Sequence, residues 1–333
     1  MSTLISVIMP VYNERDELTP NFGNLVYQSI YETYGEDALE IILIDDASTD
    51  GTAQVVDDIV NQFPTRVKGY HLPERLSQGG ACNVGLEQAR GFYVAFMTPA
   101  DMLDVRFYET LYYKALGEGF AYDYVDSTVF LEGTEKTILS TPAEFQGELS
   151  SEMRCALLAD TGLLYSKIFR KDFLTENHIR LRDHTVSGDA DEDFIAEAIC
   201  RARNVAVSTE PLYVRKKKEK RASLARTDLF TEHFSALVSS CIAVYGRLSG
   251  LPAYEEVRLG AETFYLRRLA MTLRLYEKQM AAGKLASPYD EQLLTTIRFA
   301  AETIIRTPIA ENALATRALS GAARERLQRY LGM

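Results

Sequence analysis

The sequence predicts an α/β protein with a mainly parallel sheet and helices on both of its faces, followed by an all-helical C-terminal region. Two observations support this prediction. In the first part of the chain, short apolar runs alternate with longer stretches in which apolar residues recur at helical spacing. Strands that alternate with helices form βαβ units, whose strands run parallel. After residue 228 only helical spacing remains, punctuated by Gly and Pro.

The predicted strands of the first part are apolar along their whole length, which is typical of strands covered on both faces. They lie at residues 4–12, 41–44, 67–72 and 91–97, and the intervening helices are expected at residues 21–34, 52–63 and 79–90. Ser48 or Asp50 can cap the helix that begins near Thr52, and Gly51 eases the turn before it.

The pattern is mixed in the middle of the chain. Strands are predicted at residues 122–131 and 205–216, a strand or turn leading into a helix at 165–179, and a helix at 191–204. Further helices are predicted at residues 229–248, 254–283, 287–305 and 312–331. We therefore expect two domains, residues 1–227 and residues 228–333. The helices of the second domain serve packing, or self-association as the next most common use.

The charge of the chain argues against one broad class of function. The 333 residues carry a formal net charge of -11, which disfavours a nucleic-acid binder that neutralises phosphates. One stretch, VRKKKEKR at residues 214–221, is nevertheless strongly basic. It is either a solvated loop, as most charge runs are, or a site for a phosphorylated ligand or an anionic membrane surface.

The cysteines and the N-terminal residues indicate in which cellular compartment the protein is expected. Cys82, Cys155, Cys200 and Cys241 are far apart in sequence and form no CxxC pair, which favours reduced thiols in a cytosolic protein. The apolar run near the N-terminus is too short for a signal peptide or a membrane span. We therefore expect a cytoplasmic protein, with peripheral contact to the inner face of the membrane as an alternative.

Three polar segments begin where a predicted strand ends, at residues 10–14, 45–52 and 98–104. In parallel sheets, ligands bind beyond the carboxyl ends of the strands. Helix capping accounts for one acid in the second segment but not for the adjacent pair Asp45 and Asp46. This pair therefore indicates a ligand site rather than a turn alone.

The order of these motifs closely resembles the family 2 glycosyltransferases, which have the GT-A fold. The family's opening strand and Pro-Val-Tyr-Asn-x-Glu signature resemble ISVIMPVYNE, and its Asp-Asp-Gly-Ser-x-Asp-Gly-Thr element resembles EIILIDDASTDGT, with Ala47 in place of Gly. Later family segments resemble ERLSQGGACNVGLEQARGFYVAFM, TPADMLDVRFYE, YSKIFRKDFLTENHIRL and DADEDF. The resemblance covers roughly residues 4–225 and predicts the fold because many elements agree in order and spacing.

The resemblance implies a nucleotide-sugar donor at the first two strand ends, and a UDP-sugar is favoured. The family binds the base and ribose at positions that correspond to Pro10, Tyr12, Glu14 and Asp46. A carboxylate there can accept hydrogen bonds from a base N–H or from ribose hydroxyls. Core packing for Tyr12 and a favourable helix dipole for Glu14 are the structural alternatives.

The resemblance also implies one catalytic base. Counting back from Phe194 in the family's Glu-Asp-x-x-Phe element places the base at Asp191, with Ala190 where Glu usually stands. A carboxylate there would take the proton of an acceptor hydroxyl that attacks the anomeric carbon, in a single inverting displacement. Alternatively, these acids mark a helix start that the helix dipole favours. Asp193 is the second candidate for the base.

The family's metal-binding loop differs in this chain. Its Asp-Ser-Asp-Asp sequence becomes TPAD at residues 98–101, which leaves Thr98 and Asp101 as donor-binding candidates and Asp101 as the metal candidate. The resemblance implies Mn²⁺ or Mg²⁺ at the diphosphate, but such cations prefer several oxygen ligands and usually a carboxylate. Thr98 and Ala100 stand where the family has acids, so the metal is in doubt.

This chain also lacks a basic residue that many members of the family carry near the diphosphate. Cys82 stands where many family members carry Arg or Lys before the Asn, here Asn83, which is itself a donor-binding candidate. Lys or Arg can replace a metal in stabilising a leaving phosphate. The basic run therefore supplies candidates for a lid over the diphosphate: Arg215, Lys216, Lys217 and Lys218.

The implied activity is transfer of a sugar from a nucleotide-sugar donor to a hydroxyl of a glycan, polyol-phosphate or protein acceptor, as in bacterial cell-surface polysaccharide synthesis. The acids retained at Asp46 and Asp191 favour an enzyme. The alternative is a weak or inactive homologue that binds a nucleotide or glycan, or that assembles a homo-oligomer or complex through its C-terminal helices.

Overall fold

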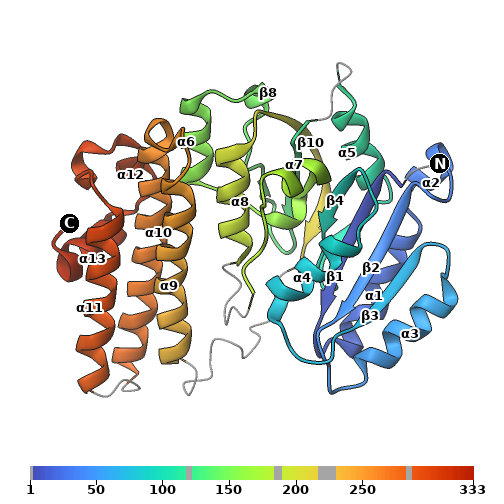
Figure 1. Cartoon of the computed structure of the whole chain (residues 1–333), viewed down its shortest axis with the longest axis horizontal. Coiled ribbons are helices and arrows are strands. Elements are labelled where there is room, and N and C mark those ends of the chain that lie inside the picture. The colour runs from blue at the N-terminus through green and yellow to red at the C-terminus, as the bar shows by residue number, and fades with distance from the viewer. Residues whose placement is uncertain (1–2, 118–121, 184–189, 217–229, 283–286) are drawn as a thin grey trace. The chain divides into compact units, whose positions relative to one another are not determined.

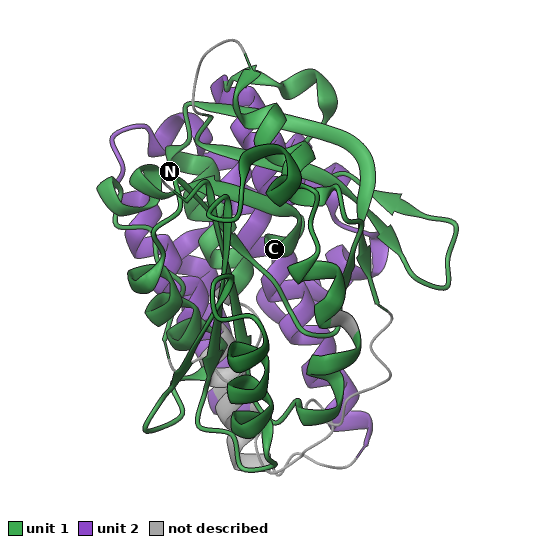
Figure 2. Ribbon diagram, turned by 90° about the vertical axis from the view of Figure 1, so that its right-hand side faces the viewer, with its two compact units in different colours: residues 1–149, 162–219 green, residues 150–161, 220–333 purple. Residues whose placement is uncertain are grey.

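A computed structural model of the chain describes residues 3–117, 122–183, 190–216, 230–282 and 287–333. The chain divides into two compact units, which Figure 2 shows in different colours. Unit 1 comprises Met1–Leu149 and Gly162–Glu219, and unit 2 comprises Ser150–Thr161 and Lys220–Met333. The predicted domain boundary between residues 227 and 228 lies outside the described residues and stays a prediction. The sequence did not predict that residues 150–161 belong with the helical unit.

In the described residues, unit 1 contains one ten-stranded sheet (Figure 1). Its strands follow in the order β3 (Val67–His71), β2 (Leu39–Asp45), β1 (Ile5–Val11), β4 (Tyr93–Phe96), β9 (Lys167–Arg170), β6 (Tyr124–Leu131), β10 (Asn204–Arg215) and β5 (Met102–Leu103), while β7 (Thr137–Ile138) pairs with β6 and β8 (Gly147–Glu148) with β10. The central strands β1, β2 and β4 are buried almost throughout, because helices cover both faces.

The first four strands form the parallel part of the sheet, as predicted. β1 lies between β2 and β4 and runs parallel to both, and β3 is parallel to β2. The chain moves outward from β1 to β3 and then returns to the other side of β1 as β4. Right-handed crossovers therefore put α1 (Arg15–Val26) and α3 (Thr52–Gln62) on one face and α4 (Ser77–Gln88) on the other. This reversal creates a switch point at the carboxyl ends of β1 and β4, where ligands bind.

The remainder of the sheet is mixed. β9 runs antiparallel to β4 and β6, whereas β10 is parallel to β6 and antiparallel to β5. The register of β10 against β6 shifts between Ser208 and Tyr213, on either side of Pro211, because proline has no N–H for the ladder. The helices here are α2 (Ile30–Tyr34), α5 (Phe107–Ala115), α7 (Lys171–Glu176) and α8 (Ala190–Arg201). The predicted α/β architecture is confirmed, with a mixed sheet.

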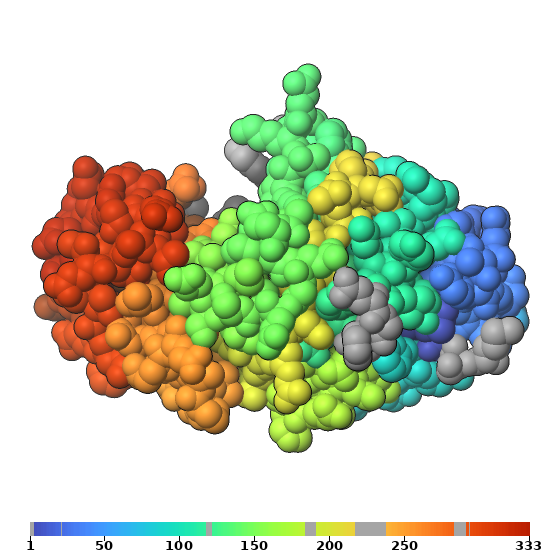
Figure 3. Space-filling view, turned by 90° about the horizontal axis from the view of Figure 1, so that it is seen from above, coloured from blue at the N-terminus to red at the C-terminus, as the bar shows by residue number. Residues whose placement is uncertain are grey.

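One surface feature of unit 1 is the turn between β6 and β7. Residues 133–138 are exposed along this turn, which belongs to the green surface of Figure 3. Glu135 and Lys136 lie in the turn and provide surface positions where a substitution is expected to have little effect on stability.

Unit 2 is helical in its described residues, as predicted for the C-terminal region. It comprises α6 (Ser151–Ala159), α9 (Phe230–Ser249), α10 (Tyr254–Ala281), α11 (Ser287–Ile304), α12 (Ala313–Ala318) and α13 (Gly321–Leu331). The long helix α10 packs against all the others. At Gly260 it approaches α6 so closely that an added Cβ would lie 2.5 Å from Cα of Cys155. No described helix is both long and apolar enough to cross a membrane.

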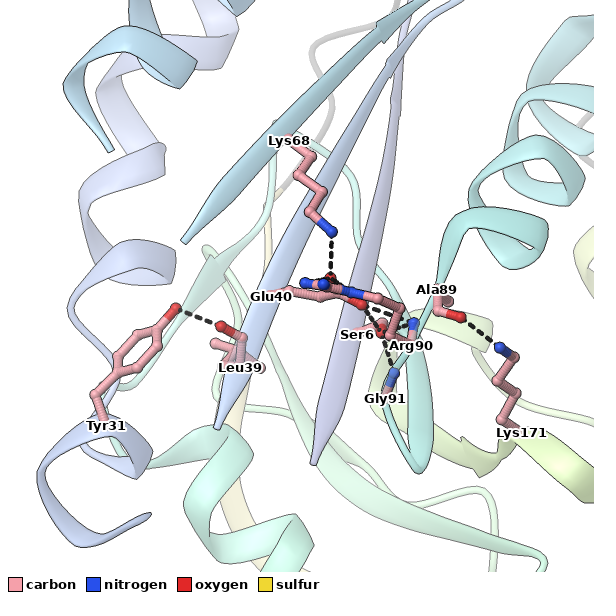
Figure 4. Close-up of polar contacts among 9 residues, drawn as sticks. All are labelled: Ser6, Tyr31, Leu39, Glu40, Lys68, Ala89, Arg90, Gly91 and Lys171. Carbon is pink, nitrogen blue, oxygen red and sulfur yellow. Dashed lines mark hydrogen bonds and ion pairs between the residues drawn. The ribbon is translucent and has the colours of Figure 1, made fainter. Parts of the chain in front are cut away.

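The buried carboxylate of Glu40 ties the amino-terminal edge of the parallel strands together (Figure 4). It accepts hydrogen bonds from Ser6 Oγ on β1 at 2.6 Å and from Arg90 N, before β4, at 2.7 Å. The Arg90 guanidinium and Lys68 Nζ on β3 complete the cluster, at 2.8 and 3.2 Å. Burial raises the pKa of the Glu40 carboxyl, but these hydrogen bonds outweigh burial, so its pKa lies below the ordinary value.

Glu40→Gln should destabilise unit 1. The variant keeps the size of the side chain but removes the charge that Arg90 and Lys68 contact, so we expect the free energy of unfolding to fall by about 1–3 kcal/mol at pH 7. Because the folded-state pKa of Glu40 is depressed, the wild type loses this contribution as the pH falls through that pKa. The difference between the two proteins should therefore shrink below about pH 4.

Denaturant unfolding at a series of pH values measures this difference. Glu135→Gln, in the exposed turn, is the matched control and should change stability by less than about 0.5 kcal/mol. A Glu40→Gln variant as stable as this control would show that the cluster contributes nothing to stability.

Candidate active site

A cleft of about 180 Å³ lies at the switch point of the sheet. Its walls come from the end of β1, from the segments that follow β1, β2 and β4, from the turn between β3 and α4 with the start of α4, and from a turn before β9. The lining residues are Pro10, Val11, Tyr12, Glu14, Asp46, Arg75, Gln78, Met97, Thr98, Pro99 and Tyr165. The register explains this convergence, because Val11 at the end of β1 pairs with Asp45 at the end of β2. The polar segments that the sequence analysis singled out thus meet in one place.

One end of the cleft is formed by Asp46, Tyr12 and Arg75. The buried Asp46 carboxylate accepts a hydrogen bond from the backbone N–H of Leu76 at 2.7 Å, and Arg75 Nε lies 4.0 Å from its other oxygen. The Arg75 guanidinium carbon also lies 3.8 Å from the centre of the Tyr12 ring. Burial raises the pKa of Asp46, opposed by the Leu76 N–H and the charge of Arg75. A carboxylate, a guanidinium and an aromatic face are therefore grouped here.

The neighbouring acid, Asp45, has a different task. Its Oδ1 accepts a hydrogen bond from Ser48 N at 3.1 Å, and its Oδ2 lies 3.1 Å from His71 Nδ1 on β3. Between the two acids and Ser48, Ala47 takes the left-handed conformation with φ of 57°, where the family pattern has Gly. Asp45 therefore shapes the turn, so that the adjacent Asp46 faces the cleft. Of the two adjacent acids, Asp45 therefore stabilises the turn and Asp46 lines the cleft.

The other end of the cleft lies beside the start of α8. Gln78 and Tyr165, which both line the cleft, hydrogen-bond each other, and Gln78 Nε2 lies 3.3 Å from Asp191 Oδ1. Burial and the charge of Asp191 raise the pKa of the Tyr165 hydroxyl. Burial likewise raises the pKa of Cys82, with the charges of Asp191 and Asp46 adding to it, so both acids act on one buried thiol. Asp191 thus contacts Gln78, which lines the cleft together with Asp46.

Two other predicted residues are engaged in structural contacts. Asp193, the second candidate for the base, is buried and accepts a hydrogen bond from Arg182 Nε at 2.6 Å. Asn83 is buried on α4 and exchanges hydrogen bonds with the backbone of Leu181, at 2.7 and 3.1 Å. Neither residue lines the cleft, and these hydrogen bonds lead to Arg182 and Leu181 and not to a lining residue, so their predicted roles in chemistry and donor binding gain no support from the geometry.

The loop after β4 contains the remaining candidates. Thr98 lines the cleft, and its Oγ1 is buried without a hydrogen-bond partner in the structure. Asp101 is buried, and both of its oxygens are occupied: Oδ2 by the hydroxyl of Tyr213 at 2.6 Å and Oδ1 by the N–H of Lys216 at 3.0 Å. No group of three or more His, Cys, Asp or Glu side chains converges among the described residues. These residues do not fit the divalent metal that the family implies.

The basic run is described only at its beginning. Arg215 ends β10, and Lys216 follows it with Nζ 3.4 Å from Glu132 Oε1. Lys217 and Lys218 lie outside the described residues, so their predicted role as a lid stays a prediction.

Three lining residues were not predicted from sequence: Arg75, Gln78 and Tyr165. Arg75 and Gln78 flank the turn into α4, where Ser77 takes the left-handed conformation with φ of 67°. The sequence feature that could have indicated Arg75 and Gln78 is the polar run between a predicted strand and a predicted helix. Tyr165 belongs to a 3₁₀ turn, Leu164–Ser166, that precedes β9, and nothing in its sequence surroundings distinguishes it from core.

Comparison with known proteins agrees with this geometry. Residues 6–149 match the family model described as Glycosyl transferase family 2. An uncharacterised glycosyltransferase of Haemophilus influenzae is 37% identical over 100 residues, which make up 30% of this chain and 37% of that protein. Poly(ribitol-phosphate) beta-N-acetylglucosaminyltransferase TarS of Staphylococcus aureus is 26% identical over 212 residues, 62% of this chain and 34% of that protein. The matched stretch therefore spans about a third of each of these relatives.

Solved structures extend the likeness to the whole chain. The chain aligns with the crystal structure of S. aureus TarS 1-349 in complex with UDP-GlcNAc with a TM-score of 0.72. The alignment covers 97% of this chain and 88% of the TarS chain. Its sequence identity of 19% means that this likeness establishes the fold. From the matched family model and this fold together, we conclude that the chain carries a family 2 glycosyl transferase domain at residues 6–149 and has the GT-A fold.

Proposed function

We propose that the protein transfers a sugar from a UDP-sugar to an acceptor hydroxyl and inverts the anomeric centre, with Asp191 as the base. One observation carries this proposal: Asp46 lines the cleft, and Gln78, which also lines it, lies with its Nε2 3.3 Å from Asp191 Oδ1. A donor with its base at Asp46 and its sugar toward Asp191 would put the reacting carbon next to a carboxylate. Proximity of this kind supplies a large part of the rate enhancement in transfer reactions.

The grouping at Asp46 suits a uracil base. Uracil presents an N–H flanked by two carbonyl oxygens along one edge. The Asp46 carboxylate can accept from the N–H, the Arg75 guanidinium can donate to a carbonyl oxygen, and the Tyr12 ring offers a face for stacking. Guanine also presents a ring N–H beside a carbonyl oxygen, which the same pair of side chains could bind. UDP is favoured because the TarS structure that this chain resembles is a complex with UDP-GlcNAc.

The middle of the cleft offers contacts for the rest of the donor. The buried Thr98 Oγ1 lacks a partner in the structure, and an unpartnered buried hydroxyl is costly unless a ligand satisfies it. A ribose hydroxyl would supply the missing hydrogen bond. Pro10 and Glu14 line the same cleft.

The proposed step needs one proton acceptor. The acceptor oxygen bonds to the anomeric carbon while its proton passes to the Asp191 carboxylate. The bond from that carbon to the β-phosphate oxygen breaks, and UDP leaves with the bonding electrons. Gln78 donates to Asp191 at 3.3 Å and thereby helps to hold the carboxylate in place.

A polyol-phosphate polymer is the acceptor that we favour. TarS, which this chain resembles over 62% of its length, is described as acting on poly(ribitol-phosphate). A glycan or protein acceptor, a cytoplasmic location with peripheral membrane contact, and assembly through the C-terminal helices stay predictions. The alternative function, a binding subunit with little or no turnover, rests on the altered loop at residues 98–101.

Asp46→Asn should weaken UDP binding by about ten- to a hundredfold, because the amide would turn a donor toward the uracil N–H. Isothermal titration with UDP measures the effect. Asp57→Asn is the matched control: this exposed acid contacts His71 Nε2 at 3.1 Å but does not line the cleft. Equal affinities of the two variants would remove Asp46 from the base-binding site.

Asp191→Asn should lower the rate of sugar transfer by about a hundredfold or more while leaving UDP affinity unchanged, because the base acts only in the chemical step. The assay follows transfer from UDP-GlcNAc to a poly(ribitol-phosphate) acceptor. Glu192→Gln, one residue along the same helix turn, is the control and should retain transfer. Retained turnover in Asp191→Asn would exclude it as the base. Absent turnover in the wild type, with UDP still bound, would favour the binding-subunit alternative.

A further inference from the structure

The acid that remains in the altered loop acts as a tether. Asp101 is 2% exposed, and its two oxygens accept from the Tyr213 hydroxyl on β10 and from the backbone N–H of Lys216 just beyond β10. Leu103 and Met102 also pair with Tyr213 and Val214 in an antiparallel ladder. The loop after β4 and the end of β10 are therefore fastened together by main-chain and side-chain bonds.

This tether uses the atoms that a metal would need. Divalent cations such as Mn²⁺ and Mg²⁺ take carboxylate and other oxygen ligands from several residues. Each oxygen of Asp101 already accepts one hydrogen bond inside a buried site, so a metal there would find only one carboxylate, with a single lone pair left on each oxygen. Ala100 has no ligand atom in its side chain, and Thr98 offers only a hydroxyl. Within the described residues, the donor set at this loop does not suit a metal.

The same tether positions a fixed cation. Arg215 is held on both sides, because its carbonyl oxygen accepts from Glu132 N at 3.0 Å and the next N–H is bound by Asp101. Arg215 directly precedes Lys216, whose N–H Asp101 binds. The tether therefore holds the backbone of Arg215 next to the loop whose Thr98 lines the cleft. A guanidinium can offset part of the negative charge of a diphosphate and donate to two of its oxygens at once.

We propose that the protein binds the diphosphate of its donor without a divalent metal, and that Arg215, positioned by the Asp101–Tyr213–Lys216 tether, supplies the positive charge in its place. The proposal rests on the proposed function, since it concerns the UDP portion of the same donor. The positive charge that offsets the UDP diphosphate then belongs to a side chain of the protein and not to a bound metal ion. Asp101 is a positioning residue that does not itself contact the donor.

The first test compares UDP affinity in EDTA and in Mn²⁺ or Mg²⁺ by isothermal titration. We expect dissociation constants that agree within about twofold in the three buffers. Binding that is tenfold or more weaker in EDTA would overturn the inference but leave the proposed function standing. Absence of UDP binding in all three buffers would contradict the proposed function itself, and the inference with it.

The second test locates the charge. Arg215→Gln should weaken UDP binding by about tenfold or more in EDTA while leaving uridine binding nearly unchanged, because uridine has no phosphates. Tyr213→Phe removes one bond of the tether but no metal ligand, and should weaken UDP binding severalfold and equally with and without metal. Lys136→Gln, in the exposed turn, is the matched control for loss of one positive charge. Arg215→Gln with the UDP affinity of this control would overturn the assignment.

Discussion

The cleft depends on the parallel alignment of β1 with β2 and β4, which brings three carboxyl ends to one level. Register fixes the alignment, and a slip by one residue would separate the buried pair of Ser6 on β1 and Glu40 on β2. At the opposite edge, Glu40 binds groups from β1, from β3 and from the turn before β4. Structure at one end of the strands therefore maintains the geometry at the other, about 20 Å away for a strand of this length.

Acidic residues at the site divide into those that build it and those that face it. Asp45 binds Ser48 and His71, Asp101 binds Tyr213 and Lys216, and Asp193 binds Arg182. Asp46 lines the cleft, and Asp191 contacts the lining residue Gln78. This division explains how a cleft can be rich in acids and still accept an anionic donor: most of the negative charge is already offset by hydrogen bonds within the protein.

The sequence predicted the features that follow from local pattern. Apolar runs, strand ends and the Asp45–Asp46 pair identified the fold and one end of the cleft, and the resemblance to a family pointed to Asp191. Arg75, Gln78 and Tyr165 were missed because their importance arises only when distant segments meet. The structural use of Asp101 was missed for the same reason, since its partners lie more than a hundred residues away. Residues 150–161 carry no signal of the unit they join, because an amphipathic helix does not specify its partner.

The placement of α6 has a consequence for how this chain can be divided. Its partner α10 has Gly260 where it meets Cys155, and Ser151 also hydrogen-bonds to Glu256 at 2.6 Å. Because α6 is encoded within the first half of the sequence, no single cut yields both units intact. A fragment that ends before α9 would keep α6 with its apolar side uncovered, and a fragment that begins there would expose the complementary strip of α10 to water. The two units therefore cannot be produced intact as two contiguous fragments of the chain, even though each has its own core.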